Sequence, residues 1–395
     1  MTARLKTAIL LLTAVLSWSA PAGVYAQGPT TLEYPYIYKS TRAMGMGGAY
    51  TAVGGRVDTL FYNPAGLSNI RPGRGWEVNG FPIPINVSAE VNKGGQDFAT
   101  SLMDALNLKD RPDDPDAATR DERLQALNDL LTKHRGEKLH LRFADFPSIG
   151  RNYGGWAFGA GGLGSLRVDA IAHQGFGSDG FFEANADITY GVLGGLSTEA
   201  ADSVFAGLSL KFLHRTSLVH NFTAREMLER QVDLKEFMLN EFRRSGEALG
   251  LDAGVIWKFA PGSRLRPALG MSVMNIGDLN FRGAGRVPQT VNAGLSVNPR
   301  RALIAAIDYV DVLNGYRQDR DPAKRLRYGA ELQAFDDQPA ALALRAGMYQ
   351  GALTLGAELR ILIVTISYAK YSEETGAFAG QDKDERQLLT VNVGW

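Results

Sequence analysis

The chain has 395 residues, and its 42 Lys and Arg residues balance 42 Asp and Glu residues, so the formal net charge is zero. This balance argues against a nucleic-acid-binding protein, because such proteins usually carry a basic excess. The sequence contains no cysteine, which excludes disulfides, thiolate metal sites and a lipid anchor on a cleaved cysteine. Its 45 glycines disfavour helices and suit turns, bulges and closely packed strands.

The N-terminal segment has the three parts of a secretory signal peptide. Arg4 and Lys6 form a positive region, residues 8–16 an apolar core, and Val24–Ala26 a cleavage site. We therefore predict a signal peptide over residues 1–26 and a mature chain that starts at Gln27. The apolar core is shorter than the roughly 20 residues that a spanning helix needs. The remaining choice is between a soluble exported protein and a membrane β-barrel.

Apolar and polar residues alternate along many segments after Trp76. Between Leu249 and Phe259 the odd positions are apolar, whereas the even positions are mostly small or charged, which is the period of a β-strand. We expect about 14 such segments up to Trp395, each near the length of a tilted membrane strand. A soluble β-sandwich or propeller is the alternative, but its strands average only about five to six residues. The predicted fold is all-β, an antiparallel transmembrane β-barrel over residues 76–395.

The polar face of these strands would line the barrel lumen. Its predicted lumen-facing charged residues are Asp187, Asp252, Lys258, Arg325, Arg327, Glu331, Glu358 and Arg360. We expect these charges to pair with one another, because unpaired ions away from water are costly. Such a lumen suits a fatty acid less well than one lined by Phe and Leu.

The last seven residues, 389–395, alternate in the same way and end on the aromatic Trp395. This pattern is similar to the terminal strand that the barrel-assembly machinery of the bacterial outer membrane reads. We therefore predict that this machinery and outer-membrane lipid are partners of the chain.

Two stretches change from the strand period to a helical one. Apolar residues recur at spacings of three and four near 97–135 and near 223–246. Both stretches are too long for periplasmic turns, so we predict helical insertions in extracellular loops. They would either cap the barrel and pack on its rim, or contact a partner or form a ligand entrance.

Residues 27–75 have no clean period and are rich in glycine. Gly45, Gly47 and Gly48 permit close backbone approach, and Asn63–Pro64, followed by Ala65, is typical of a turn or a helix start. We predict that this compact segment is a hatch, or plug domain, inside the lumen, with Asn63, Pro64 and Ala65 at its hinge.

The same two motifs carry a family resemblance. Residues 42–49 (RAMGMGGA) and 62–67 (YNPAGL) resemble the FadL-type outer-membrane transporter superfamily, and most closely its PorV-like and TraF-like (conjugal-transfer) branch. The resemblance implies a 14-stranded barrel plugged by its N-terminal segment. In the FadL type, hydrophobic molecules enter from outside and leave through a lateral opening or past the hatch, whereas the PorV branch serves a secretion system.

The sequence motifs that could indicate an enzyme active site, a metal site or a cofactor site are weak. Residues 159–164 match G-x-G-x-x-G, but strands flank the motif on both sides, so a dinucleotide site is not expected. The five histidines show no metal-ligand spacing, and the aspartates of 110–116 lack the Gly and Glu of a calcium loop. We predict no enzyme activity, no metal and no cofactor.

Two functional hypotheses follow. The first is passive outer-membrane transport of hydrophobic compounds, fatty-acid-like or hydrocarbon-like, through a plugged lumen. The second is a non-transporting surface scaffold, or a secretion or conjugation accessory of the PorV kind that binds a secretion-system protein.

Overall fold

The computed structural model describes residues 33–72, 75–94, 120–173, 181–223, 243–260, 262–316, 321–337 and 339–395. The predicted signal peptide, residues 1–26, lies outside the described residues. In the described ranges, no helix has both the length and the apolar composition needed to cross a membrane.

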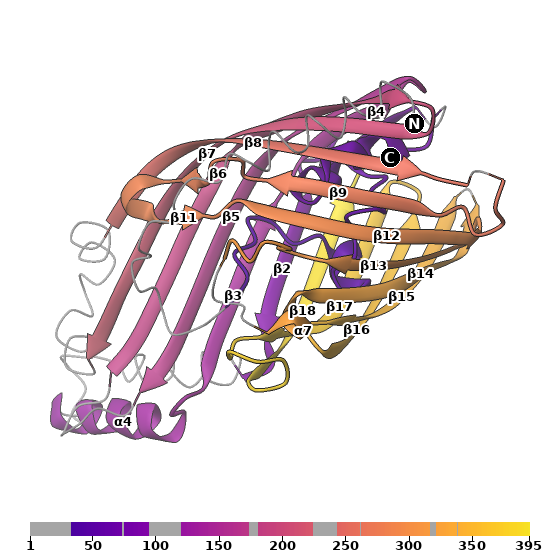
Figure 1. The fold of residues 1–395 in the computed structure, drawn as a ribbon. Helices are drawn as coiled ribbons and strands as arrows, with labels where there is room; N and C mark the ends of the chain where they lie inside the picture. Colours follow the sequence, from indigo (N-terminus) through magenta and orange to yellow (C-terminus); the bar gives the residue numbers. More distant parts are fainter. Residues whose placement is uncertain are drawn as a thin grey trace.

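One antiparallel sheet closes on itself as a barrel (Figure 1). Its segments are β1 (Trp76–Asn79), β2 (Asn86–Asn92), β3 (Lys138–Asp145), β4 (Ser148–Asn152), β5 (Trp156–His173), β6 (Phe181–Ala201), β7 (Val204–Thr223), β8 (Arg243–Lys258), β9 (Ala268–Met274), β12 (Thr290–Arg300), β13 (Leu303–Tyr309), β14 (Leu326–Asp337), β15 (Ala340–Tyr349), β16 (Ala352–Ile361), β17 (Val364–Glu374) and β18 (Lys383–Val393). Pairing of β5 with β6 and of β18 with β2 closes the ring. Because β1 continues β2 and β4 continues β3, these segments form a 14-stranded barrel.

The alternation in the sequence explains which face of each strand points outward. In β8 the apolar Leu249 is 70% exposed on the outer face, whereas Asp252 is 0% exposed on the inner face. Leu208, Leu210 and Phe212 of β7 are likewise exposed. A ring of strands that shows apolar side chains outward and polar ones inward matches a lipid-facing barrel.

The two ends of the barrel differ in their connections. At one end, tight turns join β6 to β7, β12 to β13 and β16 to β17, and Trp395 lies beside them, because Gly394 N donates to the Ile363 carbonyl. The opposite end carries the small sheet of β10 (Leu279–Asn280) and β11 (Arg286–Val287), the turn η3 (Arg282–Ala284) and the short helix α7 (Pro322–Arg325). Since outer-membrane barrels place short turns in the periplasm, we call these the inner end and the outer end.

The barrel wall is interrupted at one place near the inner end. The β2–β3 ladder stops at Val87 and Asp145, and the β1–β4 ladder resumes at Asn79 and Ser148. Between them, residues 80–85 turn away to bond with β18, since the amides of Gly80 and Phe81 donate to the Val393 carbonyl. Opposite this segment, Pro147 lies between β3 and β4 and has no amide hydrogen to donate to a ladder.

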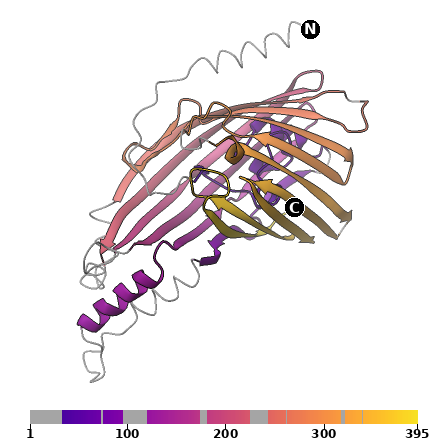
Figure 2. The ribbon, with the colours of Figure 1, turned by 60° about the horizontal axis from the view of Figure 1, so that its bottom comes forward.

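The two predicted helical insertions are only partly within the described residues. In the first, helix α4 (Arg120–Lys133) lies beyond the outer end of the barrel (Figure 2), and residues 97–119 are outside the described part. In the second, the helical prediction is wrong at its ends, because Thr223 pairs with Phe181 at the end of β7 and residues 243–246 begin β8. Cross-strand hydrogen bonds override the local helical period there, and residues 224–242 are not described.

Candidate functional site

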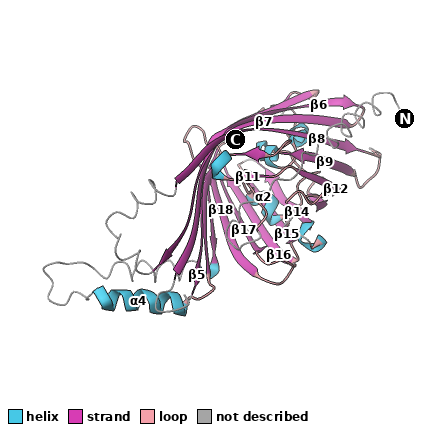
Figure 3. Ribbon diagram, turned by 60° about the vertical axis from the view of Figure 1, so that its left-hand side comes forward, coloured by secondary structure: helices cyan, strands magenta, loops and turns pink. Residues whose placement is uncertain are grey.

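The N-terminal segment lies inside the barrel, and we call its residues 33–70 the hatch (Figure 3, where α2 lies within the ring of strands). It contains the helix α2 (Thr41–Gly45) and the 3-10 turns η1 (Val57–Phe61) and η2 (Pro64–Asn69). Ser40 caps α2 by accepting from the Ala43 amide. Asn63 caps η2 by accepting from the Ala65 amide, with Pro64 at the first position, the place where its missing N–H is harmless.

Glycines allow the hatch backbone to lie directly on the barrel wall. A Cβ atom at Gly47, whose φ is +66°, would lie 2.5 Å from the carbonyl oxygens of Met348 and Tyr328. A Cβ atom at Gly45 would lie 3.1 Å from the Cα of Gly356, and one at Gly48 would lie 2.9 Å from Arg327 Cδ. The three predicted hatch glycines therefore lie at the contact between the hatch and strands β14, β15 and β16.

Replacing Gly47 with alanine is expected to displace the hatch or block its docking, since the added methyl group has no room. Gly277→Ala is the matched control, because Gly277 also has a positive φ, +78°, but nothing lies within 4 Å of its added Cβ. Both variants incur the left-handed strain of about 1–2 kcal/mol, and only Gly47→Ala adds a backbone clash. The measurement is the temperature at which the folded barrel loses its heat-modifiable migration on a gel. Equal temperatures for the two variants would mean that the contact at Gly47 does not hold the hatch.

Asn63 ties the hatch to the opposite side of the wall. Its side chain is 0% exposed, and its Nδ2 donates to the carbonyls of Thr51, at 2.8 Å, and Val255, at 3.3 Å. A Cβ atom added at Gly207 of β7 would lie 2.4 Å from the Ala65 nitrogen and 2.5 Å from the Pro64 carbonyl carbon. Asn63, Pro64 and Ala65 are thus packed tightly against the barrel wall and hold this part of the hatch in place.

A first set of buried charges joins the hatch to the outer half of the wall, and we call it the Lys39 cluster. Lys39 Nζ lies 3.0 Å from Glu33, 3.1 Å from Glu90 and 2.9 Å from Glu373. Arg386 of β18 lies 3.0 Å from Glu33. Burial alone would raise the pKa of the Glu33 carboxyl, but Arg386 and Lys39 hold that pKa well below its usual range. Lys39 itself has a raised pKa, because its carboxylate partners outweigh burial.

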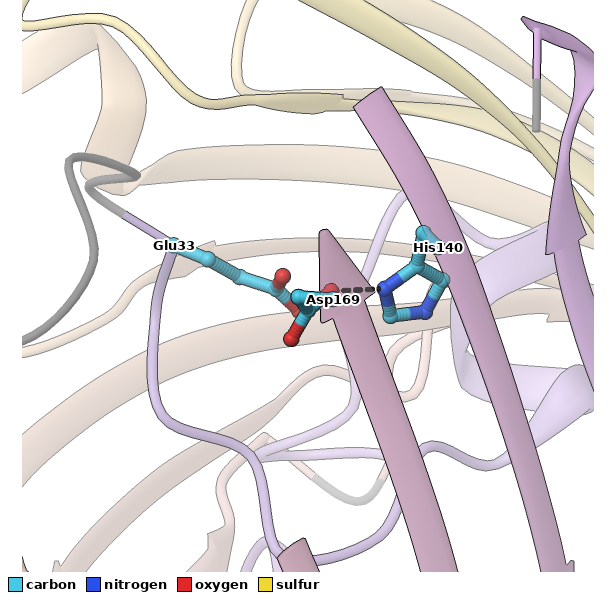
Figure 4. Close-up of side chains that lie close together, drawn as sticks. All are labelled: Glu33, His140 and Asp169. Atoms are coloured by element: carbon cyan, nitrogen blue, oxygen red, sulfur yellow. Dashed lines mark hydrogen bonds and ion pairs between the residues drawn. The ribbon is translucent and has the colours of Figure 1, made fainter. Parts of the chain in front are cut away.

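Glu33, His140 and Asp169 bring three metal-capable side chains together within the Lys39 cluster (Figure 4). Their ligand atoms lie within 4.8 Å of one another, and His140 Nδ1 is 2.5 Å from Asp169. However, the oxygen of Glu33 already contacts both Lys39 and Arg386 at 3.0 Å. Two fixed cations on one ligand oxygen neutralise and occupy it, so the arrangement works as an ion-pair network rather than as a metal cage.

A second set, the Arg42 cluster, joins the hatch to β14, β15 and β16. Arg42 forms a bidentate pair with Glu331, at 2.8 and 2.7 Å, and Arg345 Nε donates to the same carboxylate at 2.6 Å. Arg345 also reaches Glu358 at 2.9 Å, and Glu358 in turn pairs with Arg56 of the hatch. Bidentate arginine–carboxylate pairs are strong and directional, so this cluster fixes both the position and the orientation of α2.

The eight charged residues predicted for the lumen fall into three groups. Those with opposite-charge partners are Glu331 and Glu358 in the Arg42 cluster, Asp252 with Lys211, Asp187 with Arg167, and Arg360 with Asp336. Of the remaining three, Lys258 lines the inner cavity and Arg327 lines the outer one. Arg325 ends helix α7 at the outer end and donates to the Asp311 carbonyl at 3.0 Å.

Two cavities lie on opposite sides of the hatch. The outer one, of about 50 Å³, is enclosed by hatch residues 34–38 and by the outer ends of the wall strands. The inner one, of about 1510 Å³, reaches from the underside of the hatch to turn residues such as Ser203 and Arg301. Tyr38 lines both cavities, and its ring packs against Phe61 at 4.8 Å and Phe146 at 5.5 Å between ring centroids.

Several residues of this site were not singled out from the sequence. Arg345 and Arg386 lie on inward positions of β15 and β18, and the strand alternation already contained that information. Lys39 offered no such pattern, because the hatch has no period, and Arg42 stood out only as the first residue of the 42–49 motif, with no role assigned to its charge. Their role depends on which wall carboxylates they meet, which only the fold determines.

No protein-family model matches the sequence, and no curated protein does. Among solved structures, the toluene transporter TodX of Pseudomonas putida is 13% identical and aligns over 92% of this chain and 98% of its own at a TM-score of 0.50. A TodX deltaS2S3 mutant, described as a monoaromatic hydrocarbon channel, has the same identity and coverage at a TM-score of 0.53. The chain has the fold of TodX.

At this identity the likeness to TodX concerns the fold alone. It agrees with the 14-stranded barrel and the internal N-terminal segment that the FadL-type resemblance implied. The PorV-like and TraF-like branch finds no support among the compared proteins and stays a prediction.

Proposed function

We propose that the protein is a passive outer-membrane transporter of hydrophobic compounds, whose hatch must shift to let a molecule pass. The observation that carries the proposal is the pair of cavities on opposite sides of the hatch, which share Tyr38 as a lining residue. A compound that enters from the outer end would meet the aromatic outer cavity first, pass Tyr38 and reach the inner cavity. The TodX fold supports this reading, since TodX is a toluene transporter.

The interrupted wall supports an exit toward the membrane. Residues that border the interruption, among them Asn79, Asn86, Phe146 and Ser148, also line the inner cavity. Phe81 and Ile83 of the diverted segment are 57% and 51% exposed. A hydrophobic molecule in the inner cavity would therefore find apolar side chains and no continuous hydrogen-bond ladder at this point. We propose this interruption as the exit, with no energy source and no chemical step.

Uptake of radiolabelled toluene by cells tests the proposal. Cells whose outer membrane contains the protein are expected to accumulate toluene faster than otherwise identical cells that lack it, because lipopolysaccharide slows the unaided entry of hydrophobic molecules. Equal initial rates at equal cell density, with the protein shown to be folded in the membrane, would contradict a transport role.

A disulfide between hatch and wall tests whether the hatch must move. Ser68 Oγ of the hatch lies 2.6 Å from Ser197 Oγ of β6. This separation is close to the S–S bond length of about 2.0 Å, so cysteines at these two positions would place their sulfur atoms near bonding distance. The natural chain has no cysteine, so a Ser68→Cys/Ser197→Cys variant has a single thiol pair. We expect toluene uptake to fall when the pair is oxidised and to recover after reduction with dithiothreitol.

The two single-cysteine variants are the controls, since neither can form the crosslink. They are expected to take up toluene at the wild-type rate under both redox conditions. If the oxidised double variant transports as fast as the reduced one, the molecule passes without a shift of the hatch at Ser68, and this part of the proposal is wrong.

A further inference from the structure

Arg327 of β14 differs from the other buried arginines of the lumen. It is 1% exposed, yet among the described residues no carboxylate forms an ion pair with it, and its Nε has no hydrogen-bond partner. Arg42, Arg345 and Arg386 are also buried, but each has carboxylate partners. Burial of an unpaired charge is costly, and within the described residues no side chain supplies the carboxylate that would neutralise Arg327.

Tyrosine rings partly compensate this charge. The guanidinium lies 5.2 Å from the ring centroid of Tyr34, 5.3 Å from that of Tyr36 and 4.6 Å from that of Tyr349. Such cation–π contacts hold a guanidinium in place without neutralising it. The charge is therefore positioned but still available to an anion.

The free guanidinium lines the outer cavity. That cavity measures about 50 Å³, and a bound water needs about 10–15 Å³ measured in this way, so the space suits three to five water-sized positions. Ile37, Met274, Val287 and Val310 provide its apolar lining. The other cation there, Lys211, is already engaged by Asp252 at 2.8 Å and by Asn275 at 2.6 Å.

We propose that the outer cavity is a binding site for a short-chain monocarboxylate of about the size of propionate. Its carboxylate would pair with the Arg327 guanidinium, which presents paired N–H donors that match a carboxylate. Its alkyl group would lie against the apolar lining. The inference goes beyond the proposed transport of neutral hydrophobic compounds, because that transport does not require an anion site.

Titration calorimetry of the purified full-length barrel in detergent tests the site. Propionate is expected to bind one per chain. Propionamide, which has the same size but no charge, is expected to bind at least about tenfold more weakly, since it loses the charge-assisted hydrogen bonds. The comparison of these two ligands uses only the wild-type protein and so does not depend on how any variant folds.

Variants then assign the site to Arg327. Arg327→Gln is expected to weaken propionate binding by at least about tenfold, and Arg327→Lys to weaken it less, because a lysine keeps the charge but not the paired donors. Arg360→Gln is the control, since Arg360 lines the inner cavity and pairs with Asp336, and it should bind propionate as the wild type does.

Absence of propionate binding to the wild type, equal binding of propionamide, or equal affinity in folded Arg327→Gln would each overturn the inference. None of these results bears on toluene uptake. The carboxylate site and the transport role can therefore fail independently.

Discussion

A Tyr38→Ala variant is expected to take up toluene several-fold faster than the wild type. Tyr38 is 5% exposed and lines both the outer and the inner cavity, so its ring is part of the partition between them. Its removal would join the two spaces without any displacement of the hatch. The stability of the folded barrel should fall by about 3–5 kcal/mol, the usual effect of deleting a buried aromatic ring.

The comparison with Phe61→Ala separates the partition from packing in general. Phe61 packs against the same ring, at 4.8 Å between centroids, but lines only the outer cavity. It should lose stability without a comparable gain in uptake. In the oxidised Ser68→Cys/Ser197→Cys background, Tyr38→Ala is expected to restore uptake, because it opens a path that needs no hatch movement. A Tyr38→Ala variant no faster than Phe61→Ala would show that the ring does not separate the cavities.

Glu331→Gln is expected to release the hatch from the wall. Glu331 is 1% exposed and is the carboxylate shared by Arg42 and Arg345. Without it, the hydrogen-bond partners that Arg42 keeps among the described residues are neutral, namely the Tyr50 hydroxyl and the Gly54 carbonyl. Loss of one partner of a buried pair costs about 3–5 kcal/mol. We expect a lower urea midpoint for the barrel and faster proteolysis within residues 33–70.

Asp336→Asn is the matched control for Glu331→Gln. Asp336 also pairs with two arginines, at 2.6 Å with Arg71, which directly follows the hatch, and at 3.0 Å with Arg360, but these pairs are partly exposed. Exposed pairs contribute only about 0–1 kcal/mol, so this variant should stay close to the wild type. If the two variants lose the same stability, the Arg42 cluster is no stronger than a surface ion pair, and the hatch is held by packing alone.

The barrel could be predicted from the sequence because the strand period is local. Outward Leu249 and inward Asp252 follow from counting alternate positions, and the structure places them so. The helical period near residues 223 and 243 was misleading at its ends, because Thr223 and Arg243 take part in ladders whose partners are distant in sequence. The free energy of such cross-strand pairing cannot be inferred from a segment of a few residues, because the partner strand lies elsewhere in the sequence.

The sequence by itself determined the strands, the two faces of each strand and a glycine-rich N-terminal segment without a period. It also indicated that the lumen charges must be paired, since the cost of a buried ion is a general property of charge. Only the tertiary structure decided which charges meet: Lys39 with Glu33, Glu90 and Glu373, and Arg42 with Glu331. It also showed Arg327 without a carboxylate partner among the described residues and placed Tyr38 between two cavities. Ion pairing and cavity shape depend on distances of a few ångströms between residues far apart in the chain, and no local pattern encodes those distances.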